Sequence, residues 1–218
     1  MTRPRLLDLF CGAGGAAMGY HRAGFDVVGI DLVMRRGYPF PRVQADALEF
    51  VAAAGHKFDA IHASPPCQAY SFATKPASRA SHPDLVAVTR TALEATGRPW
   101  IIENVPRAPL RTDFKLCGCM FGLPRLRRER WFETSWHGFD LRPPCFHAEP
   151  TLAVVSGGRQ SRESWAPTAH AELMPLKAAA MGIDWIPLDH QGRTDLALAV
   201  PPDYTEYLGR YLLAEVKK

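Results

Sequence analysis

The cysteine at position 67 stands in a sequence context that suits a reactive thiol. It follows Pro65 and Pro66 and precedes Gln68, within the stretch Ser64-Pro65-Pro66-Cys67-Gln68. Two prolines fix the backbone direction and cannot continue a strand ladder, so they hold the next residue in a stiff turn. Taken alone, a cysteine is a small buried apolar residue about as often as it is a reactive one. The rigid residues before the thiol and the polar residue after it favour a nucleophile at Cys67.

Charged side chains at two other places could act with this thiol. Glu103 directly follows the apolar run 100–102, and a carboxylate there is costly unless it is paired or functional. The alternative for Glu103 is a salt-bridged strand end. Four arginines crowd into residues 125–130, and alternation along a predicted strand places Arg128 and Arg130 on one face. Either arginine could instead bind phosphate or belong to a solvated basic patch.

A glycine-rich turn near the N-terminus predicts a second functional feature. Residues 11–15 read Cys-Gly-Ala-Gly-Gly, between a predicted strand at 5–10 and a predicted helix at 16–23. Glycines there let the backbone approach a ligand closely, and the helix N-terminus offers free N–H groups. Asp31 ends the next strand, where an acidic side chain commonly accepts hydrogen bonds from ribose hydroxyls. A strand-to-helix turn without a ligand is the alternative, because the Gly-x-Gly-x-x-Gly spacing is incomplete.

The elements that must position these residues alternate between strands and helices. Further strands are predicted at 43–45, 58–63, 100–102 and 131–134. Further helices are predicted at 47–54, from about 82 to 95, at 176–181 and after the Pro201-Pro202 pair. Asp46 precedes the second helix as a plain N-cap, which does not exclude ligand contact. This alternation predicts an α/β fold with a doubly wound parallel sheet. Between residues 135 and 175 the periodicity fades, which predicts a small irregular insert.

The composition is typical of a soluble globular protein. The 218 residues are 47% hydrophobic and 22% charged, with a net charge of +4, which permits a nucleic-acid partner without requiring one. No apolar run approaches the roughly 18 residues of a membrane span. Five cysteines form no dense framework, so we expect a reducing compartment and a cytoplasmic location.

Four short stretches, in this order, resemble motifs of the DNA (cytosine-5)-methyltransferase family, in a form typical of short phage or bacterial members. Residues 8–15 resemble the family's S-adenosylmethionine loop, and residues 64–68 its nucleophile motif. Glu103-Asn104-Val105 resembles the acidic motif, and residues 127–130 the paired-arginine motif. The resemblance covers residues 5–134 and returns at 175–212. Each motif is short, but four in the family's linear order, each at a strand end, are together specific.

The resemblance implies a Rossmann-like S-adenosylmethionine-dependent methyltransferase fold. It divides the chain into a catalytic domain, residues 1–134 with 176–218, and a target-recognition insert at 135–175. It implies S-adenosylmethionine as cofactor and S-adenosylhomocysteine as product. The catalytic residues would be Cys67, Glu103, Arg128 and Arg130. The cofactor would be bound by Phe10, Gly12, Ala13, Gly15, Asp31, Leu32, Asp46, Ala47 and Pro66.

The activity that the resemblance implies is methyl transfer to carbon 5 of a cytosine flipped out of DNA, through a covalent adduct with Cys67. A protonated Glu103 would bind N3 of the base and its exocyclic amine. One arginine would meet the base's carbonyl oxygen, and the other would steady the cysteine turn. The alternatives are a nucleic-acid-binding protein without turnover and the same reaction on RNA. The expected partner is double-stranded DNA, and a cognate restriction endonuclease is a candidate second partner. We expect a monomer that does not bind a membrane.

Three features depart from the family's pattern. Leu126 stands where the family usually has Gln, and residues 197–199 read Ala-Leu-Ala where Gly-Asn usually precedes Val-Pro-Pro. The insert is also short, so we expect a short recognition site, with Arg159, Gln160, Ser161 and Arg162 as base-reading candidates.

Three cysteines and a histidine offer a possible zinc cluster. Cys117, Cys119, Cys145 and His147 have Cys-x-Cys and Cys-x-His spacings, tighter than those of usual zinc sites, and the two pairs are far apart in the chain. We therefore expect no metal.

Overall fold

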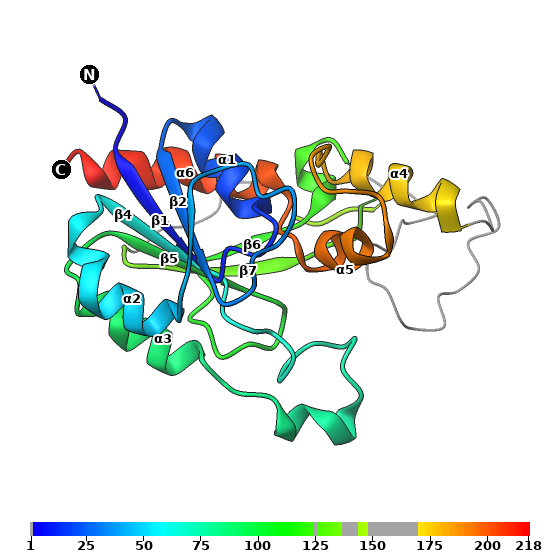
Figure 1. Ribbon diagram of the computed structural model, residues 1–218, viewed down its shortest axis with the longest axis horizontal. Helices are drawn as coiled ribbons and strands as arrows, with labels where there is room; N and C mark the ends of the chain where they lie inside the picture. The colour runs from blue at the N-terminus through cyan, green and yellow to red at the C-terminus, as the bar shows by residue number, and fades with distance from the viewer. Residues whose placement is uncertain (1, 124–125, 137–143, 148–169) are drawn as a thin grey trace.

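One seven-stranded sheet organises the chain, in the order β3-β2-β1-β4-β5-β7-β6 (Figure 1). The computed structural model describes residues 2–123, 126–136, 144–147 and 170–218. The strands are β1 (Arg5–Leu9), β2 (Asp26–Asp31), β3 (Arg42–Gln44), β4 (Ala60–Ala63), β5 (Trp100–Asn104), β6 (Phe114–Leu116) and β7 (Arg130–Thr134).

The sheet reverses its winding direction at β1, which pairs in parallel with both β2 and β4. From β1 the chain winds outward through β2 and β3, and then returns to build β4 and β5 on the other side. β7 runs antiparallel to β5, and β6 antiparallel to β7. The predicted doubly wound α/β sheet is confirmed. Such sheets bind ligands beyond the carboxyl ends of the strands on either side of the reversal, here β1 and β4.

Helices cover both faces of the sheet (Figure 1), with α1 and α6 on one face and α2 and α3 on the other. The helices are α1 (Gly15–Ala23), α2 (Ala47–Ala54), α3 (Val86–Glu94), α4 (His170–Ala180), α5 (His190–Leu198) and α6 (Pro202–Val216), with 3-10 turns η1 (Gly55–Lys57), η2 (Pro76–Ser81) and η3 (Gly118–Phe121). No helix in the described part of the chain is long and apolar enough to cross a membrane.

The two cores follow from the alternation of side chains along β1. Leu6 packs into the core under α1 and α6 with Tyr20 and Leu208, whereas Leu7 packs into the core under α2 and α3 with Val51. Because both faces are covered, the strands are apolar at consecutive positions. α1 and α6 pack closely at Gly19, where a Cβ would lie 2.1 Å from the carbonyl oxygen of Pro202.

Several element boundaries differ from the sequence predictions. α3 begins at Val86 rather than near residue 82, because Asp84 lies outside the helix and accepts a hydrogen bond from the N–H of Val86. α4 extends back to His170 through Pro175, a residue that predicted a later start. α5 was not predicted, since its sequence contains Gly192 and lacks a clear apolar stripe. β7 begins at Arg130, so Arg128 precedes the strand.

The predicted insert at 135–175 is described only in part. Residues 137–143 and 148–169 lie outside the described residues, and with them Arg159, Gln160, Ser161 and Arg162. α4 crosses the predicted boundary between residues 175 and 176. The division into catalytic domain and insert therefore stays a prediction.

Candidate active site

A cavity of about 680 Å³ opens beyond the carboxyl ends of β1 and β4, a volume typical of small-molecule sites. The loop after β1 carries the glycine-rich turn, and the loop after β4 carries Cys67. Both loops line the cavity because their strands are neighbours in the sheet. The cavity lining includes Cys67, Glu103, Arg130, and all nine predicted cofactor-binding residues: Phe10, Gly12, Ala13, Gly15, Asp31, Leu32, Asp46, Ala47 and Pro66.

Asp31 connects the glycine-rich turn after β1 with the residues that follow β2. Its carboxylate accepts hydrogen bonds from the N–H of Gly12 and the N–H of Val33, each at 2.9 Å. The side chain therefore ties the turn after β1 to the end of β2, while it remains part of the cavity lining. An acidic group held in this way can accept hydrogen bonds from ligand hydroxyls with its remaining lone pairs.

Two glycines of the turn have different surroundings. Gly12 has φ +51°, and a Cβ built there would meet nothing within 4 Å, so the backbone is open to a ligand. At Gly15 a Cβ would lie 2.2 Å from the carbonyl oxygen of Val200. Gly12 thus offers the close backbone approach that the sequence predicted, whereas Gly15 lets the segment before α6 pack against α1.

Asp46 caps α2, as predicted. One carboxylate oxygen accepts from the N–H groups of Leu48 and Glu49, at 2.8 and 3.0 Å. The residue also lines the cavity, so capping and ligand contact remain compatible at this position.

Cys67 lines the same cavity, on the turn that follows β4. Asn104 on β5 fixes this turn through a 2.9 Å hydrogen bond from its side-chain amide to the carbonyl oxygen of Pro65. The carbonyl of Cys67 accepts from the N–H groups of Tyr70 and Ser71. Burial, and then the charge of Glu103, raises the pKa of the Cys67 thiol, while Arg130 opposes this rise. The thiol is therefore protonated at neutral pH until a ligand changes its surroundings.

Glu103 and Arg130 form an ion pair in the same cavity. The Nε of Arg130 lies 2.9 Å from Oε1 of Glu103, and both side chains are nearly buried. The register of β5 and β7 explains the contact: Glu103 pairs with Phe132, and Arg130 is two residues away on the same face. Burial raises the pKa of Glu103, against the opposing effects of Arg130 and a hydrogen bond from Ser64. The carboxyl therefore takes a proton, and becomes a hydrogen-bond donor, at a higher pH than an exposed glutamate does.

Arg128 is placed differently from the sequence prediction. It precedes β7, is buried, and does not line the cavity. Its guanidinium donates to the carbonyl oxygens of Ala197, at 2.7 Å, and Ala199. Burial lowers the pKa of Arg128 to about 9, which leaves it charged at neutral pH. Arg128 therefore holds the Ala-Leu-Ala segment that replaces Gly-Asn, and this segment lines the cavity.

Sequence reasoning missed a polar chain behind Glu103. The hydroxyl of Tyr20 lies 2.9 Å from Nδ1 of His62, and Nε2 of His62 lies 2.9 Å from Oγ of Ser64, which bonds to Glu103. Burial lowers the pKa of His62 to about 3, so the imidazole is neutral. A neutral imidazole that accepts from Tyr20 donates to Ser64, whose hydroxyl then donates to Glu103. A histidine inside a buried strand was the available sequence signal.

Comparisons with known proteins identify the family and support the fold. The family of C-5 cytosine-specific DNA methylases matches residues 4–112. The type II methyltransferase M.XorII of Xanthomonas oryzae pv. oryzae is 34% identical over 122 residues, which are 48% of this chain and only 29% of that protein.

Two solved structures share the fold. The Entamoeba histolytica methyltransferase EhMeth superposes with a TM-score of 0.64, at 13% identity and with 100% of both chains covered. A Spodoptera frugiperda DNMT2 variant superposes with a TM-score of 0.60 at 13% identity, and 97% of this chain and 100% of that chain are covered. At this identity the likeness concerns the fold.

Proposed function

Because the chain belongs to the C-5 cytosine-specific DNA methylase family, we propose that it transfers a methyl group from S-adenosylmethionine to carbon 5 of a cytosine in duplex DNA. The observation that carries this proposal is the shared cavity. Cys67, Glu103 and Arg130 line it together with the glycine-rich turn, Asp31 and Asp46.

The cofactor end of the cavity fits S-adenosylmethionine. The open backbone at Gly12 suits close approach of the amino-acid part, and Asp31 and Asp46 offer acceptors for ribose hydroxyls and for the adenine amine. Phe10 and Leu32 supply apolar surface for the adenine ring. When bound, the cofactor supplies an electrophilic methyl group.

Cys67 acts as the nucleophile. Its thiolate adds to carbon 6 of the cytosine, and the electron pair of the carbon 5–carbon 6 double bond becomes available at carbon 5. Carbon 5 takes the methyl group, and a base then removes the proton from the same carbon. The electron pair returns to the ring and expels the Cys67 thiolate. Because burial raises the pKa of the free thiol, we propose that the thiol passes its proton to solvent as the substrate binds.

Glu103 and Arg130 bind the edge of the base. A protonated Glu103 donates to N3, where negative charge develops during the addition, and accepts from the exocyclic amine. Arg130, held by Glu103, donates to the carbonyl oxygen of the ring. This pair of contacts selects cytosine over thymine, which lacks the amine. Since carbon 5 and carbon 6 are stacked inside a duplex, the base must leave the helix to reach the cavity.

The first experiment measures transfer of tritium from labelled S-adenosylmethionine to duplex DNA and to RNA. We expect label in DNA that DNase releases, and 5-methylcytosine in the digested nucleosides by mass spectrometry. Label that only RNase releases would reassign the substrate to RNA. Cofactor binding without incorporation on any nucleic acid would support a binding protein. A different mass on the cytosine would reassign the transferred group.

A second experiment tests the covalent step. We expect Cys67→Ala to lose turnover and to keep S-adenosylmethionine affinity, because the thiol bonds to the base and is not one of the predicted cofactor-binding residues. DNA with 5-fluorocytosine should trap wild-type protein, because fluorine cannot leave as a cation in place of the proton. Trapping by Cys67→Ala, or turnover at the wild-type rate, would reject this nucleophile.

The partners of the full activity are proposals too. The chain spans less than a third of the length of M.XorII, whose name places it among type II methyltransferases. We propose duplex DNA as the substrate of a monomeric enzyme, with a cognate restriction endonuclease as a candidate partner. Residues 135–175 would read a short target site.

A further inference from the structure

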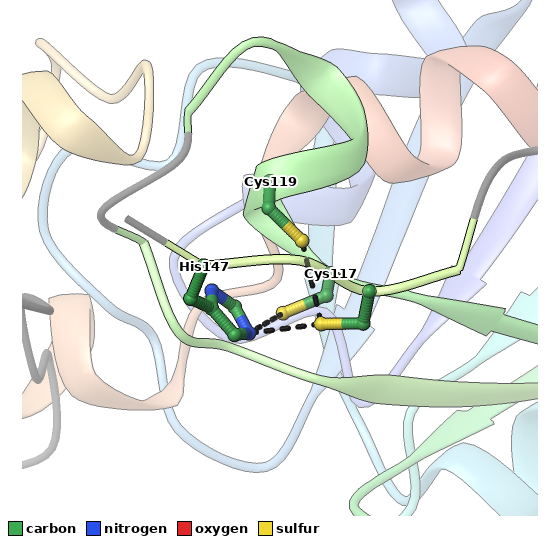
Figure 2. A group of neighbouring side chains, drawn as sticks. Cys117, Cys119 and His147 are labelled. Atoms are coloured by element: carbon green, nitrogen blue, oxygen red, sulfur yellow. Dashed lines mark hydrogen bonds between the residues drawn. The ribbon is translucent and has the colours of Figure 1, made fainter. Parts of the chain in front are cut away.

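Four potential metal ligands meet outside the proposed active site. Cys117, Cys119, Cys145 and His147 bring three sulfurs and one imidazole nitrogen within 4.8 Å of one another. Figure 2 shows His147 turned toward the cysteine sulfurs. Its Nε2 lies 2.8 Å from Sγ of Cys145 and 3.6 Å from Sγ of Cys117, and the sulfurs of Cys119 and Cys145 are 3.3 Å apart.

These separations approach those of a tetrahedral metal site. With metal–sulfur bonds of about 2.3 Å and metal–nitrogen bonds of about 2.0 Å, tetrahedral Zn²⁺ places its sulfurs about 3.8 Å apart and its nitrogen about 3.5 Å from each sulfur. The distances of 2.8, 3.3 and 3.6 Å lie within about 0.7 Å of these values, and all four ligand atoms lie within 4.8 Å of one another, so shifts of up to about 1 Å would complete the site. Three thiols and one imidazole are also a ligand set that zinc prefers over magnesium or calcium.

The local backbone explains why the tight sequence spacings are compatible with a site. Cys117 follows β6 and caps η3, and Cys119 lies in that 3-10 turn, so a single intervening residue brings both sulfurs to one side. Cys145 and His147 lie in segment 144–147, which has no regular secondary structure, and their side chains meet, with Nε2 of His147 2.8 Å from Sγ of Cys145. The spacings argued against a metal in the sequence, and the proximity of all four ligands now argues for one.

Backbone N–H groups lie close to the sulfur of Cys117. The N–H groups of Gly118 and Arg128 donate to its sulfur. Gly118 is required for this approach, because a Cβ there would lie 2.5 Å from the Cβ of Leu126. Nε2 of His147 faces the sulfurs, as a ligand nitrogen must, and Nδ1 is buried with no partner among the residues that the structure describes.

We propose that Cys117, Cys119, Cys145 and His147 bind one structural Zn²⁺ ion, which fastens segment 144–147 to β6 and η3. Four protein ligands leave no open coordination position, which is typical of structural rather than catalytic zinc. Segment 144–147 belongs to the predicted recognition insert, and Cys117 contacts the backbone of Arg128. The ion would therefore hold the insert against the catalytic domain, next to the arginine that shapes the cavity.

The experiment measures metal content in purified full-length protein by mass spectrometry. We expect about one zinc per chain. His147→Cys should keep the metal, because four thiolates also bind zinc, whereas His147→Ala should lose it. Cys145→Ser with Cys119→Ser should lose it as well. Cys67→Ala is the matched control and should keep full zinc, although the proposed methyl transfer is abolished. The result for the metal is therefore independent of the result for the enzyme.

A second set of measurements uses wild-type protein, so its outcome does not depend on whether the variants fold. Cobalt exchanged into wild-type protein should show the thiolate-to-metal charge-transfer bands of a sulfur-rich tetrahedral site. Chelation should lower the Tm of wild-type protein, and added Zn²⁺ should restore it. Zinc well below one per chain in protein expressed with supplemented zinc would overturn the proposal. A Cys119–Cys145 disulfide in protein handled with reductant, or equal zinc in His147→Ala and wild type, would overturn it too.

Discussion

The guanidinium of Arg130 lies 2.9 Å from the carboxylate of Glu103, and together they form the polar end of the cavity beside Cys67. The two residues come from antiparallel strands that are distant in sequence. Each depends on the other, because a buried charge without a partner is costly. Arg130 favours the anionic form of Glu103, while burial favours the protonated form, which the proposed contact with cytosine requires.

Arg130→Leu should separate these two effects. Without the guanidinium the pKa of Glu103 rises further, so the carboxyl stays protonated up to a higher pH and loses its ion-pair partner. We expect turnover to fall about 10²- to 10³-fold, the usual cost of removing one donor that stabilises developing charge. Because the folded pKa is raised, the variant should lose stability relative to wild type as pH increases. Denaturant unfolding at several pH values measures this difference.

Two further variants control this prediction. Arg127→Leu removes an exposed arginine of the same cluster and should change neither stability nor turnover. Adding Glu103→Gln to Arg130→Leu should flatten the extra pH dependence, because no carboxyl is left to ionise. An unchanged pH dependence in the double variant would show that the effect comes from another group.

Gly12→Ala should mainly weaken cofactor binding, whereas Gly15→Ala should mainly lower the stability of the fold. A Cβ at Gly12 meets no protein atom, so we expect a loss of about 1 kcal/mol from the left-handed backbone and a marked loss of S-adenosylmethionine affinity. A Cβ at Gly15 meets the backbone of Val200, so we expect a loss of about 1–3 kcal/mol in stability. Calorimetric titration with the cofactor and thermal unfolding distinguish the two. Unchanged affinity in Gly12→Ala would remove this turn from the cofactor site.

Arg128→Met should destabilise the protein more than Arg127→Met does. The first change leaves the carbonyl oxygens of Ala197 and Ala199 without their buried donor, which costs about 1–3 kcal/mol for each unsatisfied group. The second change is exposed and should be nearly neutral. Urea unfolding measures both. Equal stability of the two variants would mean that the segment before α6 keeps its place without Arg128.

The sequence predicted the local turns that line the cavity because each depends on a short local pattern. An apolar run that predicts a strand precedes each of three features: the turn after β1, the proline-containing turn at Cys67, and Glu103. Parallel pairing of β1 and β4 then brings the two turns together. The family resemblance supplied the cofactor contacts, and all nine of those residues line the cavity.

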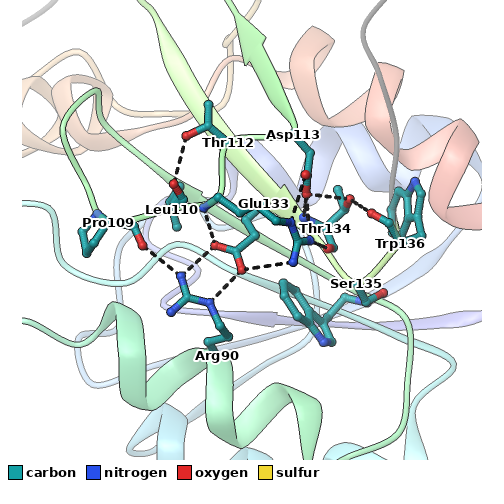
Figure 3. Close-up of polar contacts among 11 residues, drawn as sticks. Arg90, Pro109, Leu110, Thr112, Asp113, Glu133, Thr134, Ser135 and Trp136 are labelled. Carbon is teal, nitrogen blue, oxygen red and sulfur yellow. Dashed lines mark hydrogen bonds and ion pairs between the residues drawn. The ribbon is translucent and has the colours of Figure 1, made fainter.

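The sequence did not predict features that depend on contacts between residues distant in the chain. Arg128 was placed on a strand because charges alternate there, yet its hydrogen bonds to Ala197 and Ala199 come from residues about 70 positions away. The ion pair of Arg90 with Glu133, from α3 to β7, is another such contact (Figure 3). The four-ligand cluster around Cys117 likewise joins two segments that are separated by β7.

His62 should make the protein sensitive to acid. The imidazole is neutral in the folded state because burial lowers its pKa to about 3, whereas an unfolded histidine titrates near 6.5. Between these values the unfolded chain binds the extra proton, so stability is fully present above the unfolded pKa and falls as the pH drops. The fall amounts to at most about 1.4 kcal/mol per pH unit.

His62→Gln should reduce this slope, because glutamine can bond to both Tyr20 and Ser64 but does not titrate. The free energy of unfolding, measured in urea across the acid range, gives the difference between the two slopes. His56→Gln, which changes a histidine on the surface, should keep the wild-type slope. If His62→Gln kept it as well, acid sensitivity would have to come from other groups. Weaker turnover in His62→Gln at neutral pH, with unchanged cofactor affinity, would indicate that the chain from Tyr20 through His62 and Ser64 positions Glu103.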